Sequence, residues 1–231
     1  MTQESGRIWV MGGRPLNGTA AVPAAKNSVL PLLAAALLCR GTVRLRAVPA
    51  LSDVECCLAL LRGAGCDARR QGADVVVSGT PVCSTLPGDA AAGAGRLVLA
   101  APGGLHGADF TLRFPSVGAT ETLLLAAVCA RGTTVLRGAA REPEISDLAD
   151  FLRRCGGQIE GAGTSTIRIE GRRTLSGCDF SPLPDRIFAS TLACAAAAAG
   201  GRVELAGCPP GLYEPVLEIL EQMGCTVKRG A

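Results

Sequence analysis

The sequence predicts an α/β fold built from β-α-β-α-β-β repeats, with helices inside and strands outside as in an inside-out α/β barrel, and with the array incomplete. Three observations predict it: a pattern that recurs three times, an all-apolar helix in each copy, and one interval of the wrong length. Such repeats bury their apolar faces only against one another, so they gather around a shared core. The copies cover residues 26–66, 116–157 and 185–225.

The first segment of each copy is predicted to be a buried helix. Residues 28–39 are apolar on nearly every side, and 122–130 and 190–199 have the same character. A helix that lacks a polar face belongs inside a protein. A glycine and a β-type run follow each of these helices, at 42–45, 133–136 and 202–205.

The second segment of each copy is predicted to be an amphipathic surface helix. These helices are expected at 53–62, 146–154 and 214–223. Ser52 and Ser146 each precede an acidic position of the helix and are reasonable start signals. Strand pairs follow, and they include residues 74–77 and 166–169.

The interval between the first two copies is too short for a complete repeat between them. We match Val43, Val135 and Val203 in the β-type runs, which lie 22, 21 and 21 residues before Gly65, Gly156 and Gly224. The valines of copies two and three are 68 residues apart, whereas those of copies one and two are 92 apart. Two periods would need more, so about 44 residues of an intervening repeat are missing.

The end of that intervening repeat can still be recognised. Residues 105–110 parallel residues 175–180, and residues 96–99 parallel 167–170. Residues 96–115 are therefore predicted to be the closing strands of a repeat whose opening is absent. The junction is expected at residues 89–95, which are small and show no periodicity.

Composition excludes several classes of function. The net charge of +3 comes from scattered basic residues, and only 3% of residues are aromatic, so no nucleic-acid surface is expected. Eleven cysteines without a Cys-x-x-Cys pair, beside one histidine, predict reduced thiols in the cytoplasm and no metal site or cofactor. No signal peptide is recognised, and the apolar run 187–201 is shorter than the roughly 18 residues of a membrane span.

Four motifs in order along the chain resemble one family. They are AKNSVLP (25–31), SVGATE (116–121), AREPEI (140–145) and LPDRI (183–187). Together they resemble the enolpyruvyl transferase family, and within it the carboxyvinyltransferases of UDP-N-acetylglucosamine more than EPSP synthase. The resemblance implies transfer of enolpyruvyl from phosphoenolpyruvate to the sugar 3-hydroxyl, in peptidoglycan precursor synthesis, with those two compounds as partners.

The resemblance also implies a domain organisation. Members have two domains of three repeats each. Residues 1–24 would be N-terminal strands that pair with the second domain, residues 25–184 the first domain with a partial middle repeat, and residues 185–231 the first repeat of a shortened second domain. The strand expected at residues 7–10 and the helix 190–199 would then lack partners, which predicts self-association.

The family's phosphoenolpyruvate site maps onto the first motif. Lys26 matches the lysine that meets the phosphate and carboxylate of this ligand, a task that suits a compact point charge. Asn27 would hydrogen-bond the same ligand or the sugar. The alternative for Lys26 is a solvated residue ahead of a helix.

The remaining motifs map onto the family's sugar-nucleotide site. Ser116, Val117 and Gly118 open a helix, where free N–H groups and the helix dipole favour an anion. Ser116 as an ordinary helix cap is an equally good interpretation. Glu142 would support the sugar-nucleotide side, although a purely structural role is at least as good, and Arg186 would serve the interdomain hinge or the ligand.

The family's proton donor has no match. That donor is the cysteine of a Pro-Gly-Gly-Cys loop, and the nearest string here, Pro102 to Leu105, ends in leucine. No residue is therefore assigned a catalytic role, and we expect the chain to be inactive alone. A non-catalytic UDP-sugar-binding or partner-binding module and a structural remnant stay open as alternatives.

Overall fold

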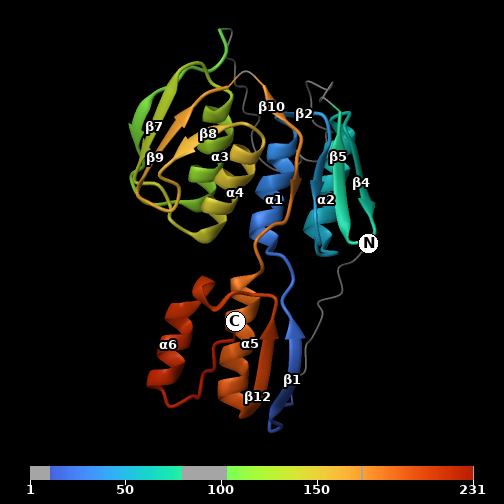
Figure 1. Cartoon of the computed structure of the whole chain (residues 1–231), viewed down its shortest axis with the longest axis vertical. Helices are drawn as coiled ribbons and strands as arrows, with labels where there is room; N and C mark the ends of the chain where they lie inside the picture. The colour runs from blue at the N-terminus through green and yellow to red at the C-terminus, as the bar shows by residue number, and fades with distance from the viewer. Residues whose placement is uncertain (1–10, 80–102, 173, 231) are drawn as a thin grey trace, which may run out of the picture. The chain divides into compact units, whose positions relative to one another are not determined.

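A computed structural model describes residues 11–79, 103–172 and 174–230. The chain divides into two compact units (Figure 1). The larger unit is Pro23–Leu183, and the smaller unit combines Met1–Val22 with Pro184–Ala231. Each unit is built around its own apolar cluster.

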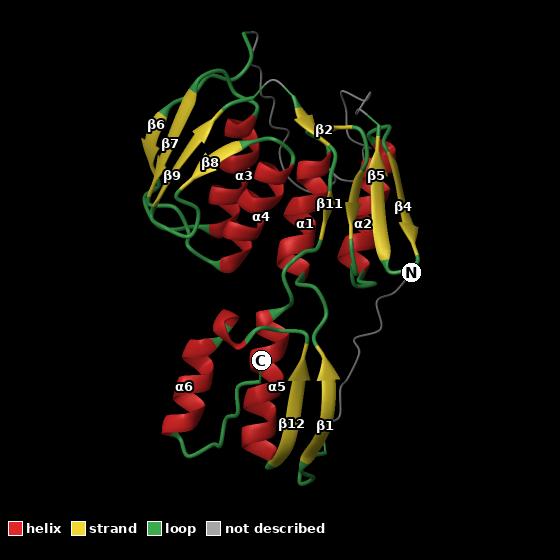
Figure 2. Cartoon of the chain, in the orientation of Figure 1, coloured by secondary structure: helices red, strands yellow, loops and turns green. Residues whose placement is uncertain are grey.

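The larger unit has helices inside and sheets outside (Figure 2). Its helices are α1 (Lys26–Ala36), α2 (Ser52–Gly63), α3 (Val117–Val128) and α4 (Pro143–Arg154). Its strands are β2 (Cys39–Arg40), β3 (Val43–Leu45), β4 (Asp67–Gln71), β5 (Asp74–Ser78), β6 (Asp109–Thr111), β7 (Thr133–Arg137), β8 (Gln158–Glu160), β9 (Thr166–Glu170), β10 (Leu175–Ser176) and β11 (Asp179–Phe180). Among the described residues they form sheets of order β11-β3-β5-β4 and β6-β7-β9-β8, and β10 pairs with β2.

The two copies in the larger unit are one residue out of the register that the sequence predicted. β11 pairs with Leu45 in the way that β6 pairs with Leu136. The equivalent of Val43 is therefore Thr134, which is buried, and not Val135. Side chains of a strand alternate between its two faces, so a match made on residue type alone selected the wrong face. With Thr134 the step to the closing glycine is 22 residues in both copies.

The helices begin earlier than their apolar periodicity predicted. α1 begins at Lys26 instead of 28, α3 at Val117 instead of 122, and α4 at Pro143 instead of 146. Apolar periodicity marks the turns that pack in the core, whereas the first turn of each helix carries polar residues. Proline suits the first helical position because its missing N–H has no intrahelical partner there.

Two predicted start signals are wrong. Ser52 is the first residue of α2, and Ser146 lies inside α4. In both helices, which lie wholly within the described ranges, no side chain of the preceding residue caps the first turn. The prediction assumed that each serine stood just outside its helix.

The smaller unit contains one βαβα repeat. It comprises β1 (Leu16–Ala21), α5 (Arg186–Ala199), β12 (Gly201–Ala206), the short 3-10 helix η2 (Pro210–Leu212) and α6 (Glu214–Gln222). β1 pairs in parallel with β12, so two ends of the sequence form one sheet. α5 begins at Arg186 rather than at 190, because the Asp185 carboxylate accepts hydrogen bonds from the backbone N–H groups of Ile187 and Phe188.

The expectation of a buried helix is wrong for α5. Within this helix, which the structure describes in full, Ala189 is the one buried residue. Ile187 and Phe188 are 50% and 38% exposed. A single repeat has no neighbouring repeats to cover the helix, whereas α1 buries six of its residues against the second copy.

Some predictions fall outside the described residues. These are the strand at 7–10, the closing strand at 96–99 and the junction at 89–95. In the parts of the chain that are described, no helix combines the length and the apolar character needed to cross a membrane.

The strands that follow the second copy meet the first copy at a seam, where β10 and β11 run parallel to β2 and β3. Between β10 and β11, Gly177 approaches the backbone of Thr42 closely: a Cβ on this glycine would lie 2.1 Å from the Thr42 carbonyl oxygen. Gly107 has the same relation to Thr133, again at 2.1 Å. Glycine is therefore required at both places where the last strands of one repeat run along the backbone of another repeat.

Replacing Gly177 by alanine should open this seam. The added methyl group would collide with backbone, which cannot rotate away, so we expect a loss of about 2 kcal/mol or more in the free energy of unfolding. Urea unfolding of Gly177→Ala against Gly211→Ala tests it, because a Cβ at Gly211 would meet no atom within 4 Å. Equal stability of the two variants would contradict a close-packed seam.

Candidate functional site

The first turns of α1, α2, α3 and α4 lie at one end of the larger unit (Figure 1). Direct contacts join them. Lys26 in the first turn of α1 places its ammonium nitrogen 2.9 Å from a carboxylate oxygen of Asp53 in α2. The two side chains are 45% and 53% exposed, so this ion pair faces solvent and is available to a ligand.

Asn27 is exposed beside Lys26. Pro31 lies one turn further along α1. Proline has no N–H, so the carbonyl oxygen of Asn27 lacks the hydrogen bond that a helix would normally supply. The first motif thus presents a cation and a side-chain amide at one helix end.

A buried carboxylate fixes the start of α1 against α4. Asp147 of α4 accepts hydrogen bonds from the Ser28 hydroxyl and, at 3.2 Å, from the Leu183 backbone N–H. The Leu183 carbonyl oxygen in turn accepts the Ala25 N–H at 2.8 Å. These contacts hold the residue ahead of Lys26 in place, so Asp147 positions the first motif without touching solvent.

The second motif opens α3. The Ser116 hydroxyl oxygen accepts a hydrogen bond from the Ala119 N–H at 3.3 Å, so the helix-cap interpretation of Ser116 describes the structure. Val117 is half-buried, and Gly118 is exposed with no atom within 4 Å of a would-be Cβ. The open backbone at Gly118 leaves room for a ligand against the helix end.

The first turns of α3 and α4 are joined through Thr120. Its hydroxyl donates to the Ser116 carbonyl oxygen at 2.7 Å and accepts the Ala140 N–H at 3.1 Å. Thr120 is fully buried. The third motif, which begins at Ala140, is thereby held next to the second.

Three carboxylates gather behind these first turns. Burial, and then the negative charge of Glu144, raise the pKa of Glu121 to about 7. Burial is also the main reason that the pKa of Asp147 is raised to about 6, against the hydrogen bonds from Ser28 and Leu183 that lower it. Near neutral pH Glu121 and Asp147 are therefore partly protonated.

The last two predicted site residues differ in their placement. Glu142 is half-buried and directly precedes α4, so it joins the same end of the larger unit. Arg186 is the first residue of α5 and belongs to the smaller unit. The larger unit therefore gathers Lys26, Asn27, Ser116 to Gly118 and Glu142, and Arg186 is placed separately.

The string that ends in Leu105 is not at this end of the unit. The Leu105 carbonyl oxygen accepts the Arg131 N–H at 2.8 Å, just beyond the last residue of α3. Ser116 is at the other end of α3, and a helix of 12 residues is roughly 18 Å long. Leu105 is thus part of a closing strand segment, as its parallel with Leu175 predicted.

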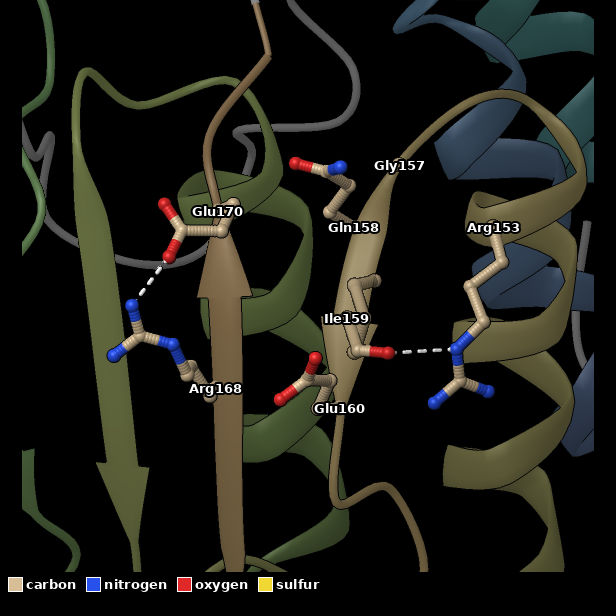
Figure 3. A pocket seen from close by; sticks show the side chains of 7 residues that line it. All are labelled: Arg153, Gly157, Gln158, Ile159, Glu160, Arg168 and Glu170. Carbon is tan, nitrogen blue, oxygen red and sulfur yellow. Dashed lines mark hydrogen bonds and ion pairs between the residues drawn. The ribbon is translucent and has the colours of Figure 1, made fainter.

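A surface hollow lies elsewhere on the larger unit (Figure 3). Its volume is about 310 Å³, and β8, β9 and the last turn of α4 line it. Arg168 pairs with Glu170, and Arg153 donates to the Ile159 carbonyl oxygen at 2.7 Å. Its charges are compensated locally, and it contains none of the predicted site residues.

Metal binding finds no support in the geometry. Across the ranges that the structure describes, no three or more histidine, cysteine, aspartate or glutamate side chains are grouped to hold a metal ion. Of the three acids behind the first turns, Asp147 already accepts hydrogen bonds from Ser28 and Leu183.

Sequence reasoning missed Asp53, the link between Ser28 and Asp147, and Glu121. Asp53 was interpreted only as part of a helix start, and Ser28 as the beginning of an apolar helix. Glu121 falls inside the motif at 116–121 but carried no signal of burial. An acidic residue in the first turn of a helix is so common that it does not single out a site.

The family model for EPSP synthase (3-phosphoshikimate 1-carboxyvinyltransferase) matches residues 10–95 and 89–231. The UDP-N-acetylglucosamine 1-carboxyvinyltransferase of Dichelobacter nodosus is 39% identical over 276 residues, which cover 97% of this chain and 66% of the relative. The enzyme of the same name from Beijerinckia indica is 38% identical and covers 96% and 65%. The chain spans less than two thirds of the length of these curated relatives.

Solved structures share the fold. The enolpyruvyl transferase NikO from Streptomyces tendae superimposes with a TM-score of 0.80 at 22% identity, over 95% of this chain and 65% of that one. EPSP synthase from Acinetobacter baumannii gives a TM-score of 0.68 at 20% identity, over 92% and 60%. At these identities the likeness concerns the fold, and it confirms the predicted α/β repeat architecture.

The buried acids predict that stability falls as pH rises from about 5 to 8. A raised pKa in the folded state means that the stabilising contribution is complete below the unfolded value near 4 and is lost as pH rises through about 6 for Asp147 and about 7 for Glu121. Replacing Glu121 by glutamine should remove on the order of 2 kcal/mol of this pH dependence. Urea unfolding at pH 5 and at pH 8 measures the difference in the free energy of unfolding.

The matched control is Glu160→Gln, because Glu160 is an exposed acid of the same unit. This variant should keep the wild-type pH dependence. If the free energy of unfolding of Glu121→Gln changes between pH 5 and 8 as much as that of the wild type, burial does not raise the pKa of Glu121.

Proposed function

We propose a function from the premise that this chain belongs to the EPSP synthase family of enolpyruvyl transferases: it is a shortened carboxyvinyltransferase of UDP-N-acetylglucosamine that does not catalyse the reaction alone. The parent reaction moves enolpyruvyl from phosphoenolpyruvate to the sugar 3-hydroxyl and releases phosphate. Its place is peptidoglycan precursor synthesis in the cytoplasm, and hence cell-wall growth, cell shape and the cell cycle.

One observation carries the proposal. Three motifs that are far apart in the sequence, at 25–31, 116–121 and 140–145, lie in or just ahead of the first turns of helices that share one end of the larger unit. Helix starts present N–H groups and a positive dipole end, and both favour anions. The two expected ligands, phosphoenolpyruvate and a nucleotide diphosphate, are anions.

We assign the ligands to parts of this end. Lys26 and Asn27 would meet phosphoenolpyruvate, with the Lys26 ammonium against its phosphate and Asp53 holding the ammonium in place. Ser116, Val117 and Gly118 would meet the diphosphate or uridine side, where the backbone at Gly118 is open. Glu142 would support the sugar side, and Arg186 of the smaller unit would serve the hinge or the ligand.

Inactivity follows from what the reaction requires. The methylene carbon of phosphoenolpyruvate must receive a proton while the sugar hydroxyl loses one, so an acid and a base must both face the ligands. The family's cysteine loop has no match here, and the string that imitates it ends in Leu105, which lies at the far end of α3. No acid is assigned to face the ligands in this chain.

We also propose how the repeats correspond to the family. Residues 1–24 are strands that pair with the second domain, 25–184 the first domain with a partial middle repeat joined near 89–95, and 185–231 the first repeat of the second domain. In support, the two ranges that match the family model, 10–95 and 89–231, overlap at residues 89–95. In addition, an alignment of 276 positions onto a chain of 231 residues leaves at least 45 positions without a residue here.

A second function is a non-catalytic module that holds the sugar nucleotide or pairs with a partner protein. The favouring observation is that Lys26, Asn27 and Gly118 of the retained motifs are open to solvent at helix starts, whereas the bond-making residues have no match. A purely structural remnant would bind neither ligand.

Phosphate release tests the first proposal. With phosphoenolpyruvate and UDP-N-acetylglucosamine present, the chain should release no phosphate above the blank, because no proton donor faces the ligands. Sustained turnover would refute the claim of inactivity.

Calorimetry separates the binding module from the remnant. Heat with UDP-N-acetylglucosamine that persists in Arg69→Ala supports the module. Loss of phosphoenolpyruvate binding in Lys26→Ala, with Arg69→Ala unchanged, would assign that ligand to Lys26. Arg69 is a suitable control because it is a similarly exposed, ion-paired cation of the larger unit. Absence of heat with either ligand would leave only the remnant.

Self-association is expected through the smaller unit. Ile187 and Phe188 expose an apolar face on α5. Light scattering of Ile187→Ser should show a lower mean mass than wild type, whereas Phe114→Ser, which changes an exposed residue of the larger unit, should not. A sharp monomer peak for the wild-type chain would contradict this prediction.

A further inference from the structure

Two cysteine side chains face each other beside the seam at which β10 and β11 meet the first copy. The sulfur atoms of Cys155 and Cys178 are 3.4 Å apart. Cys155 directly follows α4, and its carbonyl oxygen accepts the Ser176 N–H at 2.8 Å. The Cys178 carbonyl oxygen accepts the Arg44 N–H at 2.9 Å. Both residues are therefore held by backbone contacts, so the pair of sulfur atoms is kept together.

A third thiol borders the pair. Cys39 follows α1, is buried, and donates to the Ala35 carbonyl oxygen at 3.6 Å. Hydrogen bonding with Cys155 lowers the pKa of Cys39. Three thiols thus converge where β10 meets β2.

The repeat supplies an internal comparison for these positions. In the register that equates Leu45 with Leu136, the matched residues in other copies are alanines. A small apolar residue is therefore sufficient for packing there, and the cysteines supply sulfur chemistry that packing does not require. The matched pairs are Cys39 with Ala130, Cys155 with Ala64, and Cys178 with Ala108.

The two facing thiols differ in reactivity. The contact with the Cys155 thiol lowers the pKa of Cys178, with a smaller contribution from the Arg154 guanidinium. Cys178 is half-buried, whereas Cys155 is 1% exposed and its pKa is raised. Cys178 is therefore the thiol that an oxidant in solution reaches as a thiolate.

We propose that Cys155 and Cys178 are a site of oxidative modification, at which a peroxide converts the two thiols into a reversible intramolecular disulfide. The bond would join the end of α4 to the segment between β10 and β11. It would tie the segment that forms the seam covalently to α4, at a place where the strands are only two residues long.

The chemistry balances with hydrogen peroxide as the oxidant. The Cys178 thiolate attacks one peroxide oxygen, an S–O bond forms, the O–O bond breaks, and the departing hydroxide leaves as water. Cys155 then attacks the sulfenic sulfur, the S–S bond forms, the S–O bond breaks, and the second hydroxide takes the Cys155 proton. Two thiols lose two hydrogens and two electrons, and the peroxide becomes two waters. A dithiol reductant reverses the reaction.

Peptide mapping of the full chain tests the proposal. The chain is treated with limiting hydrogen peroxide, unfolded and alkylated with N-ethylmaleimide in guanidinium chloride, and digested with trypsin without reduction. Cys39, Cys155, Cys178 and Cys194 fall in separate tryptic peptides, each with a single cysteine. We expect the peptide 155–168 linked to 174–186, the peptide of the exposed Cys194 alkylated, and both linked thiols recovered after dithiothreitol.

Two variants and a mixing control sharpen the result. Cys178→Ala should leave Cys155 fully alkylated while Cys194→Ala keeps the link. The matched Ala108 predicts that Cys178→Ala folds, and Cys194 is exposed on α5. Three results would each overturn the proposal. The first is a disulfide between an isotope-labelled and an unlabelled chain, and the second is a link from Cys155 to Cys39 instead of Cys178. The third is that Cys155 and Cys178 are alkylated while Cys194 is oxidised.

Discussion

The parallel pairing of β10 and β11 with β2 and β3 is the contact on which the larger unit depends. It joins the strands that follow the second copy to the strands of the first copy, across more than 130 residues of chain. It forms only because Gly177 allows the backbone to pass within contact of Thr42. The same relation between Gly107 and Thr133 shows that the close approach is a property of the repeat.

The candidate site is a consequence of this seam. After β11 the chain reaches Leu183, which bonds to Ala25 and to the buried carboxylate of Asp147. Asp147 also accepts the Ser28 hydroxyl, so the start of α1 is fixed from two directions. The burial of a carboxylate is costly unless hydrogen bonds satisfy it, and here these bonds hold Lys26 where it meets Asp53. The burial of charge thus positions an exposed cation.

The smaller unit shows what the same repeat does without neighbours. Its β1 and β12 pair, and α6 packs against α5 around Ala189, Tyr213 and Leu217. Most of α5 nevertheless stays uncovered, although its composition matches that of α1. Apolar composition predicts that a helix will be buried, but burial needs a second surface, and in this fold the next repeat provides it.

The sequence by itself determined the kind and order of the elements, the repeat, and the motifs that mark the family. Those are local properties: apolar periodicity, glycines at turns, and short strings such as residues 25–31. Only the tertiary structure decided that Thr134 and not Val135 is the buried residue equivalent to Val43, that Lys26 meets Asp53, and that Cys155 faces Cys178. Strand register and contacts between distant segments depend on how the copies pack at the seam, and parallel pairing through a long crossover leaves no trace in neighbouring residues.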